Sequence, residues 1–193
     1  MSSIVAQIED AMIALIKAQN FGYSLKTVAS YGGELSGDAD AIARVLVGFP
    51  AVWVTFKGEG KPISHDTQRH RWLVPATFSI YAGARNVRGE RFARVGAIGE
   101  VGAYQIADDL RQLFLGKDLG LAIDYMNPGP RKTLFNANIK GNALAVQSVD
   151  FTTKYYLAVT PEAEVDWLHT GIDYFLKPGD AVADASDLLT MGN

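Results

Sequence analysis

Apolar residues recur at three- and four-residue spacing near the start of the chain. This spacing predicts a helix over residues 4–19 that turns one apolar stripe toward a core. The stripe consists of Ile4, Ile8, Met12, Leu15 and Ile16. Ser2 or Ser3 can cap the start of this helix, and Gly22 suits a left-handed cap beyond its end.

Apolar and polar residues alternate in the segments that we expect to form strands. The strongest are residues 50–57, 71–83 and 143–157, and a short extended piece covers residues 25–31. The first two strong segments are joined by a short polar connection, which favours antiparallel pairing. Pro75 lacks a backbone N–H, so it argues for an edge position or a bulge in its strand.

The hydrophobic pattern in the middle of the chain predicts helical structure. Residues 86–116 show a broken 3.6-residue period, and residues 38–47 suit a short helix. Three glycines weaken the first half of the longer region, and close helix packing or a subunit contact is the best interpretation of them. These are Gly96, Gly99 and Gly102. Short strands are expected over residues 119–125 and 131–140, around a turn at residues 127–130.

The order of helix, strands, helix and strands predicts an α+β fold with two layers. Two principal helices, near residues 4–19 and 98–115, should pack on one face of a mainly antiparallel sheet. We expect one domain over residues 1–157. Residues 158–193 form an acidic, aromatic-containing C-terminal extension and not a second domain.

Composition narrows the classes of function. The 193 residues are 48% hydrophobic and contain no cysteine, which excludes disulfide scaffolds, thiolate zinc sites and cysteine nucleophiles. A net charge of −3 disfavours a role in gripping DNA, because such proteins usually present a basic surface to the phosphates. No secretory signal is visible, and the apolar stretches are too short to span a bilayer.

Candidate chemistry is sparse. His65 and His70 flank Asp66, which is a possible ligand set for a metal, but the surrounding charges favour a solvated loop. The neighbours Asp108 and Asp109 point in different directions on a helix, so an exposed charged face is expected there. We therefore expect no catalytic residue, no metal and no cofactor.

Two groups of residues are candidates for contacts with partners. Four arginines, at three-residue spacing, would line one side of a helix start, and Lys57 and Lys61 are candidates to join them. These are Arg85, Arg88, Arg91 and Arg94, and they indicate either a contact with acidic neighbours or passing DNA, or a solvated face. The second group consists of the aromatic residues of the extension, expected to dock on a partner: Trp167, Tyr174 and Phe175.

With these elements placed, residues 4–157 resemble the Mu-like phage and prophage minor tail protein family, whose members are regarded as tail terminators. Five segments carry the resemblance by their order and spacing. They are Phe49 to Val54, Phe78 to Asn86, Gly102 to Arg111, Gly116 to Leu121 and Phe151 to Tyr155.

The resemblance implies an α+β structural subunit of a bacteriophage tail and no enzyme. Such subunits form a hexameric ring at the head-proximal end of the tail tube, stop its growth and present a surface for the head. The implied partners are other copies of the chain, the tail tube protein and the head–tail connector or neck proteins. DNA would pass through the ring without sequence-specific binding. No membrane is involved, and the protein would assemble in the host bacterial cytoplasm and reside in the virion tail.

Two other classes of function stay open at this point. One is a small α+β hydrolase or isomerase with a pocket between helices and sheet, which a cluster of titratable groups in a closed pocket would support. The other is a different neck, sheath or baseplate component of the tail.

Overall fold

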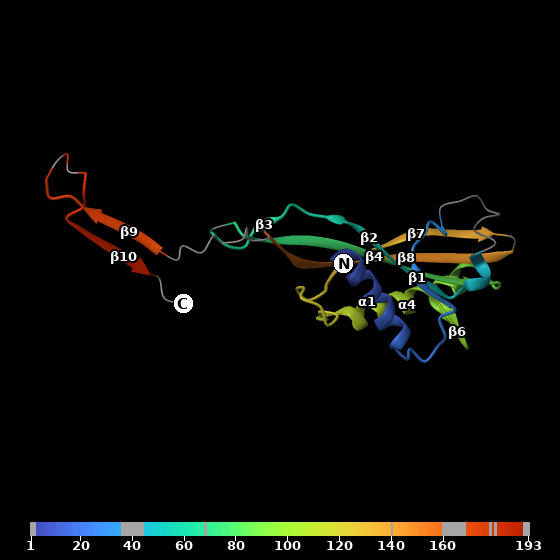
Figure 1. Ribbon diagram of the computed structural model, residues 1–193. Coiled ribbons are helices and arrows are strands. Elements are labelled where there is room, and N and C mark those ends of the chain that lie inside the picture. Colours follow the sequence, from blue (N-terminus) through green and yellow to red (C-terminus); the bar gives the residue numbers. More distant parts are fainter. Residues whose placement is uncertain are drawn as a thin grey trace. The chain divides into compact units, whose positions relative to one another are not determined.

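The computed structural model describes residues 3–35, 45–67, 69–139, 141–159, 169–177, 179 and 181–190 (Figure 1). The chain divides into two compact units, Met1–Ala158 and Val159–Asn193. The first contains the large sheet and its helices, and the second contains a two-stranded hairpin.

The sheet of the first unit has the strand order β1-β2-β4-β8-β7, and β3 pairs with β4. The strands are β1 (Thr27–Ser30), β2 (Ala51–Glu59), β3 (Ile63–Ser64), β4 (Arg71–Asn86), β7 (Asn127–Ile139) and β8 (Asn142–Ala158). Only β1 and β2 run parallel, and the other described pairs are antiparallel. The longest ladder joins β4 to β8, from Arg71 opposite Ala158 to Asn86 opposite Ala143.

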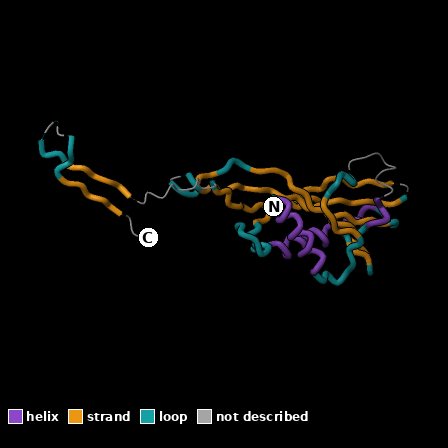
Figure 2. The backbone as a smooth tube through the Cα atoms, in the orientation of Figure 1, coloured by secondary structure: helices purple, strands orange, loops and turns teal. Residues whose placement is uncertain are grey.

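The main helices cover one face of this sheet (Figures 1 and 2). They are α1 (Ile4–Ala18) and α4 (Ala103–Phe114). Their apolar stripes are buried in one cluster with the alternate residues of the strands, so the expected α+β arrangement is confirmed. The cluster includes Ile8, Met12, Ile16, Ile106, Leu110 and Phe114 from the helices and Val52, Ile80, Val149 and Phe151 from the sheet.

A smaller apolar cluster occupies part of the opposite face. Phe49 and Trp53 meet there with their rings 5.5 Å apart, next to Leu144 and Val146 of β8. Leu46, in a short 3-10 helix (η1, Leu46–Gly48), completes the buried part of this cluster. The helix expected over residues 38–47 falls mostly outside the described residues, which resume at residue 45.

The prediction of a helix over residues 86–116 is wrong for the first half of that region. A turn at residues 87–89 is followed by α3 (Glu90–Val95) and a small hairpin of β5 (Gly96–Ala97) and β6 (Glu100–Val101), and only then by α4. Gly96 and Gly99 have φ angles of 95° and 76°, in the left-handed region. A Cβ on Gly102 would collide with the backbone of Val95 and Gly96. The glycines therefore build a tight hairpin and do not serve helix packing.

Three further expectations about the sheet are wrong. Residues 119–125 form turns with a single bridge from Ile123 to Tyr155, and residues 127–130 lie within β7 at a register shift. Pro75 lies in a central strand, because β4 is flanked by β2 and β8. Its carbonyl accepts the N–H of Gly60, so its missing N–H falls on the same side, where the chain leaves β2 for β3.

Replacing glycine by alanine tests the hairpin against the helix. In a helix, Gly99→Ala would raise the free energy of unfolding by about 1 kcal/mol. At a left-handed φ angle, the same change should lower it by about 1 kcal/mol. Gly102→Ala should lower it by about 2 kcal/mol or more, because the clash is with backbone atoms. Urea denaturation of both variants decides the matter, and stabilisation by either change would contradict the hairpin.

Candidate interaction surfaces

The four arginines do not line one side of a helix, because the structure places them in different elements. Arg85 lies near the end of β4, Arg88 lies in the following turn, and Arg91 and Arg94 lie in the six-residue α3. The side chains of Arg85, Arg88 and Arg91 have no ion pair or hydrogen bond with any described residue. These three charges are therefore exposed and available to a partner.

Arg94 differs from the other three arginines because it is held by its own chain. Its Nε lies 3.4 Å from the Glu90 carboxylate, one helical turn earlier, and its Nη1 donates a hydrogen bond of 3.4 Å to the Tyr104 hydroxyl. Arg94 therefore ties α3 to α4, and its side chain is less available for an external contact.

Residues 85–98, which we call the arginine segment, also expose large apolar side chains. Val87 is 74% exposed, Val95 is 54% exposed and Ile98, near the tip of the β5–β6 hairpin, is fully exposed. Ile98 falls within the region that the sequence pattern predicts to be helical, but it lies between β5 and β6. Exposed apolar groups beside unpaired cations are typical of surfaces that bind proteins.

Lys57 does not join the arginines. It lies near the far end of β2, where its Nζ is 2.5 Å from a carboxylate oxygen of Asp150. Asp150 is buried on the sheet face opposite the helices and also accepts a 2.5 Å hydrogen bond from the Ser79 hydroxyl. Burial alone would raise the pKa of Asp150, but the bonds from Lys57 and Ser79 and the ammonium charge outweigh it and hold this pKa below its usual value.

The two adjacent carboxylates of α4, which the sequence placed on an exposed charged face, are both bonded to other side chains of the chain. Asp108 lies 2.6 Å from Nη1 of Arg131, and Asp109 accepts a 2.9 Å hydrogen bond from the Tyr23 hydroxyl. Burial and the neighbouring carboxylate raise the pKa of Tyr23. Both contacts fasten α4 to other parts of the first unit.

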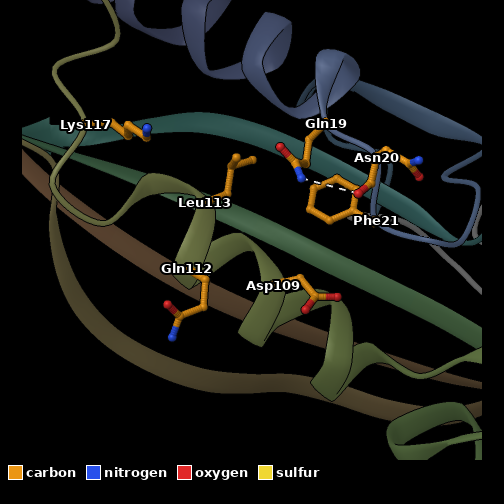
Figure 3. A pocket seen from close by; sticks show the side chains of 7 residues that line it. All are labelled: Gln19, Asn20, Phe21, Asp109, Gln112, Leu113 and Lys117. Atoms are coloured by element: carbon orange, nitrogen blue, oxygen red, sulfur yellow. Dashed lines mark hydrogen bonds between the residues drawn. The ribbon is translucent and has the colours of Figure 1, made fainter.

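A pocket of about 440 Å³ lies between the end of α1 and α4 (Figure 3). Figure 3 shows its lining residues, which are Gln19, Asn20, Phe21, Asp109, Gln112, Leu113 and Lys117. These side chains supply amides, one carboxylate and one ammonium group. They can form hydrogen bonds to a polar partner, but the set contains no hydroxyl, thiol or imidazole to act as a nucleophile beside a base.

The histidine pair lies in an exposed connection before β4. The His65 ring packs against Tyr156, with centroids 5.2 Å apart, and the Asp66 carboxylate accepts the backbone N–H of His70 at 2.8 Å. Asp66 therefore closes a turn. Within the described ranges, histidine and carboxylate side chains do not come together in a group of three that could hold a metal ion. None of the helices in these ranges is long and apolar enough to cross a membrane.

The second unit consists of an acidic hairpin. Strand β9 (His169–Tyr174) pairs antiparallel with β10 (Ala185–Thr190). Tyr174 and Phe175 are about half exposed, whereas Trp167 lies outside the described residues. Residues 159–193 contain seven carboxylates and one lysine, a net charge of −6. Because the whole chain carries −3, residues 1–158 carry +3, so the two units have opposite charge.

Comparison with known proteins gives one family match. A family model described as Bacteriophage Mu, Gp37 matches residues 4–156, which is most of the chain and nearly all of the first unit. The comparison with curated proteins finds no match. The matched range ends close to the boundary of the second unit and leaves the hairpin outside it.

The contacts of Asp150 with Lys57 and Ser79 lead to a prediction about how the stability of the fold depends on pH. Asp150→Asn should lower the free energy of unfolding by about 1–3 kcal/mol at pH 7, because a charged hydrogen-bond partner of Lys57 and Ser79 is lost. The pKa of Asp150 is lower in the folded chain than in the unfolded chain, so its contribution is present above about pH 4 and is lost as the pH falls through the folded value. Urea titrations between pH 7 and pH 3 should therefore show the two proteins converging. The exposed Asp10→Asn is the control, and equal stabilities of wild type and Asp150→Asn at pH 7 would refute the prediction.

Proposed function

The chain belongs to the Bacteriophage Mu Gp37 family, and from this premise we propose that it is a tail terminator. The family match over residues 4–156 is the observation that carries the proposal, because it makes the protein a bacteriophage protein. In this role, copies of the chain form a hexameric ring at the head-proximal end of the tail tube. The ring ends tube growth and offers a surface to the connector or neck proteins.

The sheet supports assembly by leaving strand edges available. Among the described residues no strand pairs with the outer edge of β7, and none pairs with the outer edge of β1. Unpaired backbone groups at such edges are a ready surface for another chain. The edge of β7 is the longer one, since that strand spans Asn127–Ile139 whereas β1 spans Thr27–Ser30. A ring requires two different surfaces of each copy to meet, and these edges fit that requirement.

The overall negative charge of the chain supports a channel through which DNA passes. The free side chains of Arg85, Arg88 and Arg91 lie in this proposal at a subunit boundary or at the rim of the channel. The overall charge of −3 keeps DNA from binding while it moves through. The protein assembles in the host bacterial cytoplasm and resides in the virion tail.

Electron microscopy distinguishes a ring-forming tail terminator from an enzyme. Purified protein viewed by electron microscopy should show closed rings with a central opening. In a phage that carries this gene, its inactivation should give tails of uncontrolled length that fail to join heads, because nothing stops the tube. Restoring the gene on a plasmid is the control. Monomers at all concentrations, together with normal tails after inactivation, would refute the proposal. Tails of normal length that lack a sheath or baseplate would indicate a different tail component.

Charge reversal tests the arginines. Arg88→Glu combined with Arg91→Glu should impair ring assembly at least tenfold in concentration, because it places like charges at the boundary. Lys61→Glu combined with Arg71→Glu is the matched control, since these exposed residues lie toward the opposite end of β4. The ring population is measured by mass photometry, and tail completion by complementation. Normal rings and joined tails from the first variant would mean that the arginines are only a solvated face.

A further inference from the structure

The hairpin of the second unit exposes apolar side chains on one of its two faces. In the β9–β10 register, Tyr174 lies opposite Ala185 and Ile172 opposite Asp187, and Leu189 lies two residues further along β10. Alternation places these side chains on one face, where Ile172, Tyr174 and Leu189 are 37%, 46% and 57% exposed. A hairpin of two strands is only marginally stable alone, so we expect a partner to cover its apolar face.

The arginine segment has the properties that such a partner needs. It offers the exposed side chains of Val87, Val95 and Ile98 for apolar contact. It also offers the unpaired guanidinium groups of Arg88 and Arg91, which suit the carboxylates of the hairpin. One of these carboxylates, on Asp187, lies on the same face as Ile172, is exposed and has no partner among the described residues. The opposite net charges of the two units favour the same pairing.

The reach of the chain favours a neighbouring copy as the source of the arginine segment. The extension leaves the first unit at Ala158, opposite Arg71, whereas the arginine segment begins where Asn86 lies opposite Ala143. These two ends of the ladder are about 50 Å apart, at about 3.3 Å per residue. The chain from Ala158 to His169 spans at most about 40 Å even when fully extended. A hairpin that docks in its own chain would need this link straight along the sheet, with no length left to turn.

We infer that the β9–β10 hairpin of one copy docks on the arginine segment of a neighbouring copy. The apolar face of the hairpin covers Val87, Val95 and Ile98, and Asp187, which lies on the same face opposite Ile172, meets Arg88 and Arg91. This inference rests on the proposed function, because it identifies the contact that joins successive subunits of the ring. The extension is then an arm that each subunit gives to the next.

The absence of cysteine from the chain allows a direct test. Ile172→Cys and Ile98→Cys are co-expressed as two full-length chains that differ in the size of an affinity tag. A short bis-maleimide cross-linker should then join the two chains into a heterodimer on a denaturing gel. Ile172→Cys with Lys61→Cys is the matched control, since Lys61 is exposed but lies toward the opposite end of β4, and it should give at least tenfold less product. A cross-link no stronger than this control would overturn the inference.

Charge exchange provides a second test that does not depend on cysteine. Asp187→Arg should raise the concentration needed for assembly at least tenfold. Adding Arg88→Asp and Arg91→Asp to the same chain should restore most of the loss, because the opposite charges then meet again. Failure of this restoration, with all variants folded by circular dichroism, would overturn the contact.

The outcomes separate this inference from the proposed function. Rings without the cross-link mean that the subunits meet through other surfaces and that the arm serves a different partner, so only the inference fails. The cross-link without rings, and with normal tails after gene inactivation, means that the arm joins copies in some other assembly, so the proposed function fails and the contact stands. A cross-link within one doubly substituted chain, found in monomers by mass spectrometry, overturns the inference by showing that the arm folds back.

Discussion

The ladder between β4 and β8 is the constraint on which the rest of the first unit depends. These two strands pair over the full length of β4, and each contributes alternate side chains to the core beneath α1 and α4. A one-residue slip in this ladder would move every buried side chain of one strand to the opposite face. The opposite face is specified as well, because Ser79 of β4 and Asp150 of β8 are directly opposite each other and hydrogen-bonded. The register is therefore fixed from both sides of the sheet.

Asp150 can be buried because its negative charge is paired with an ammonium group and its oxygens accept hydrogen bonds. An unpaired buried carboxylate would cost several kcal/mol, whereas here an ammonium group and two hydroxyls surround it. Gly129 of β7 lies against this residue, and a Cβ there would come within 3.0 Å of Asp150. The register shift between Pro128 and Arg131 thus lets β7 pass close to the cluster. The close approach of β7 to Asp150 therefore explains why Gly129, between two prolines, occurs within a strand.

Sequence patterns predicted the features that depend on alternation or on a regular 3.6-residue period. The strand ladder of β2, β4 and β8 and the stripe of α1 are of this kind, since burial selects the same faces that hydrophobicity marks. The failures fall where backbone conformation outweighs hydrophobicity. Ile98 belongs to an apolar period by spacing, but the left-handed φ angle of Gly99 breaks the helix beside it. The apolar part of the arginine segment was missed for this reason, and the pairing of Lys57 with Asp150 was missed because 93 residues separate the partners.

The length of the β4–β8 ladder also bears on how copies can assemble. The extension leaves at one end of this ladder, and the arginine segment lies at the other. If the extension of one copy binds the arginine segment of the next, the two surfaces in each contact are different, so the contact is heterologous. Such contacts give either a closed ring or an open filament, according to whether the rotation between neighbours closes. The ladder fixes the distance between the point where the extension leaves the first unit and the arginine segment. The unpaired edges of β1 and β7 would then set the rotation between neighbours, and the arm would add affinity by raising the effective concentration of those edges for one another.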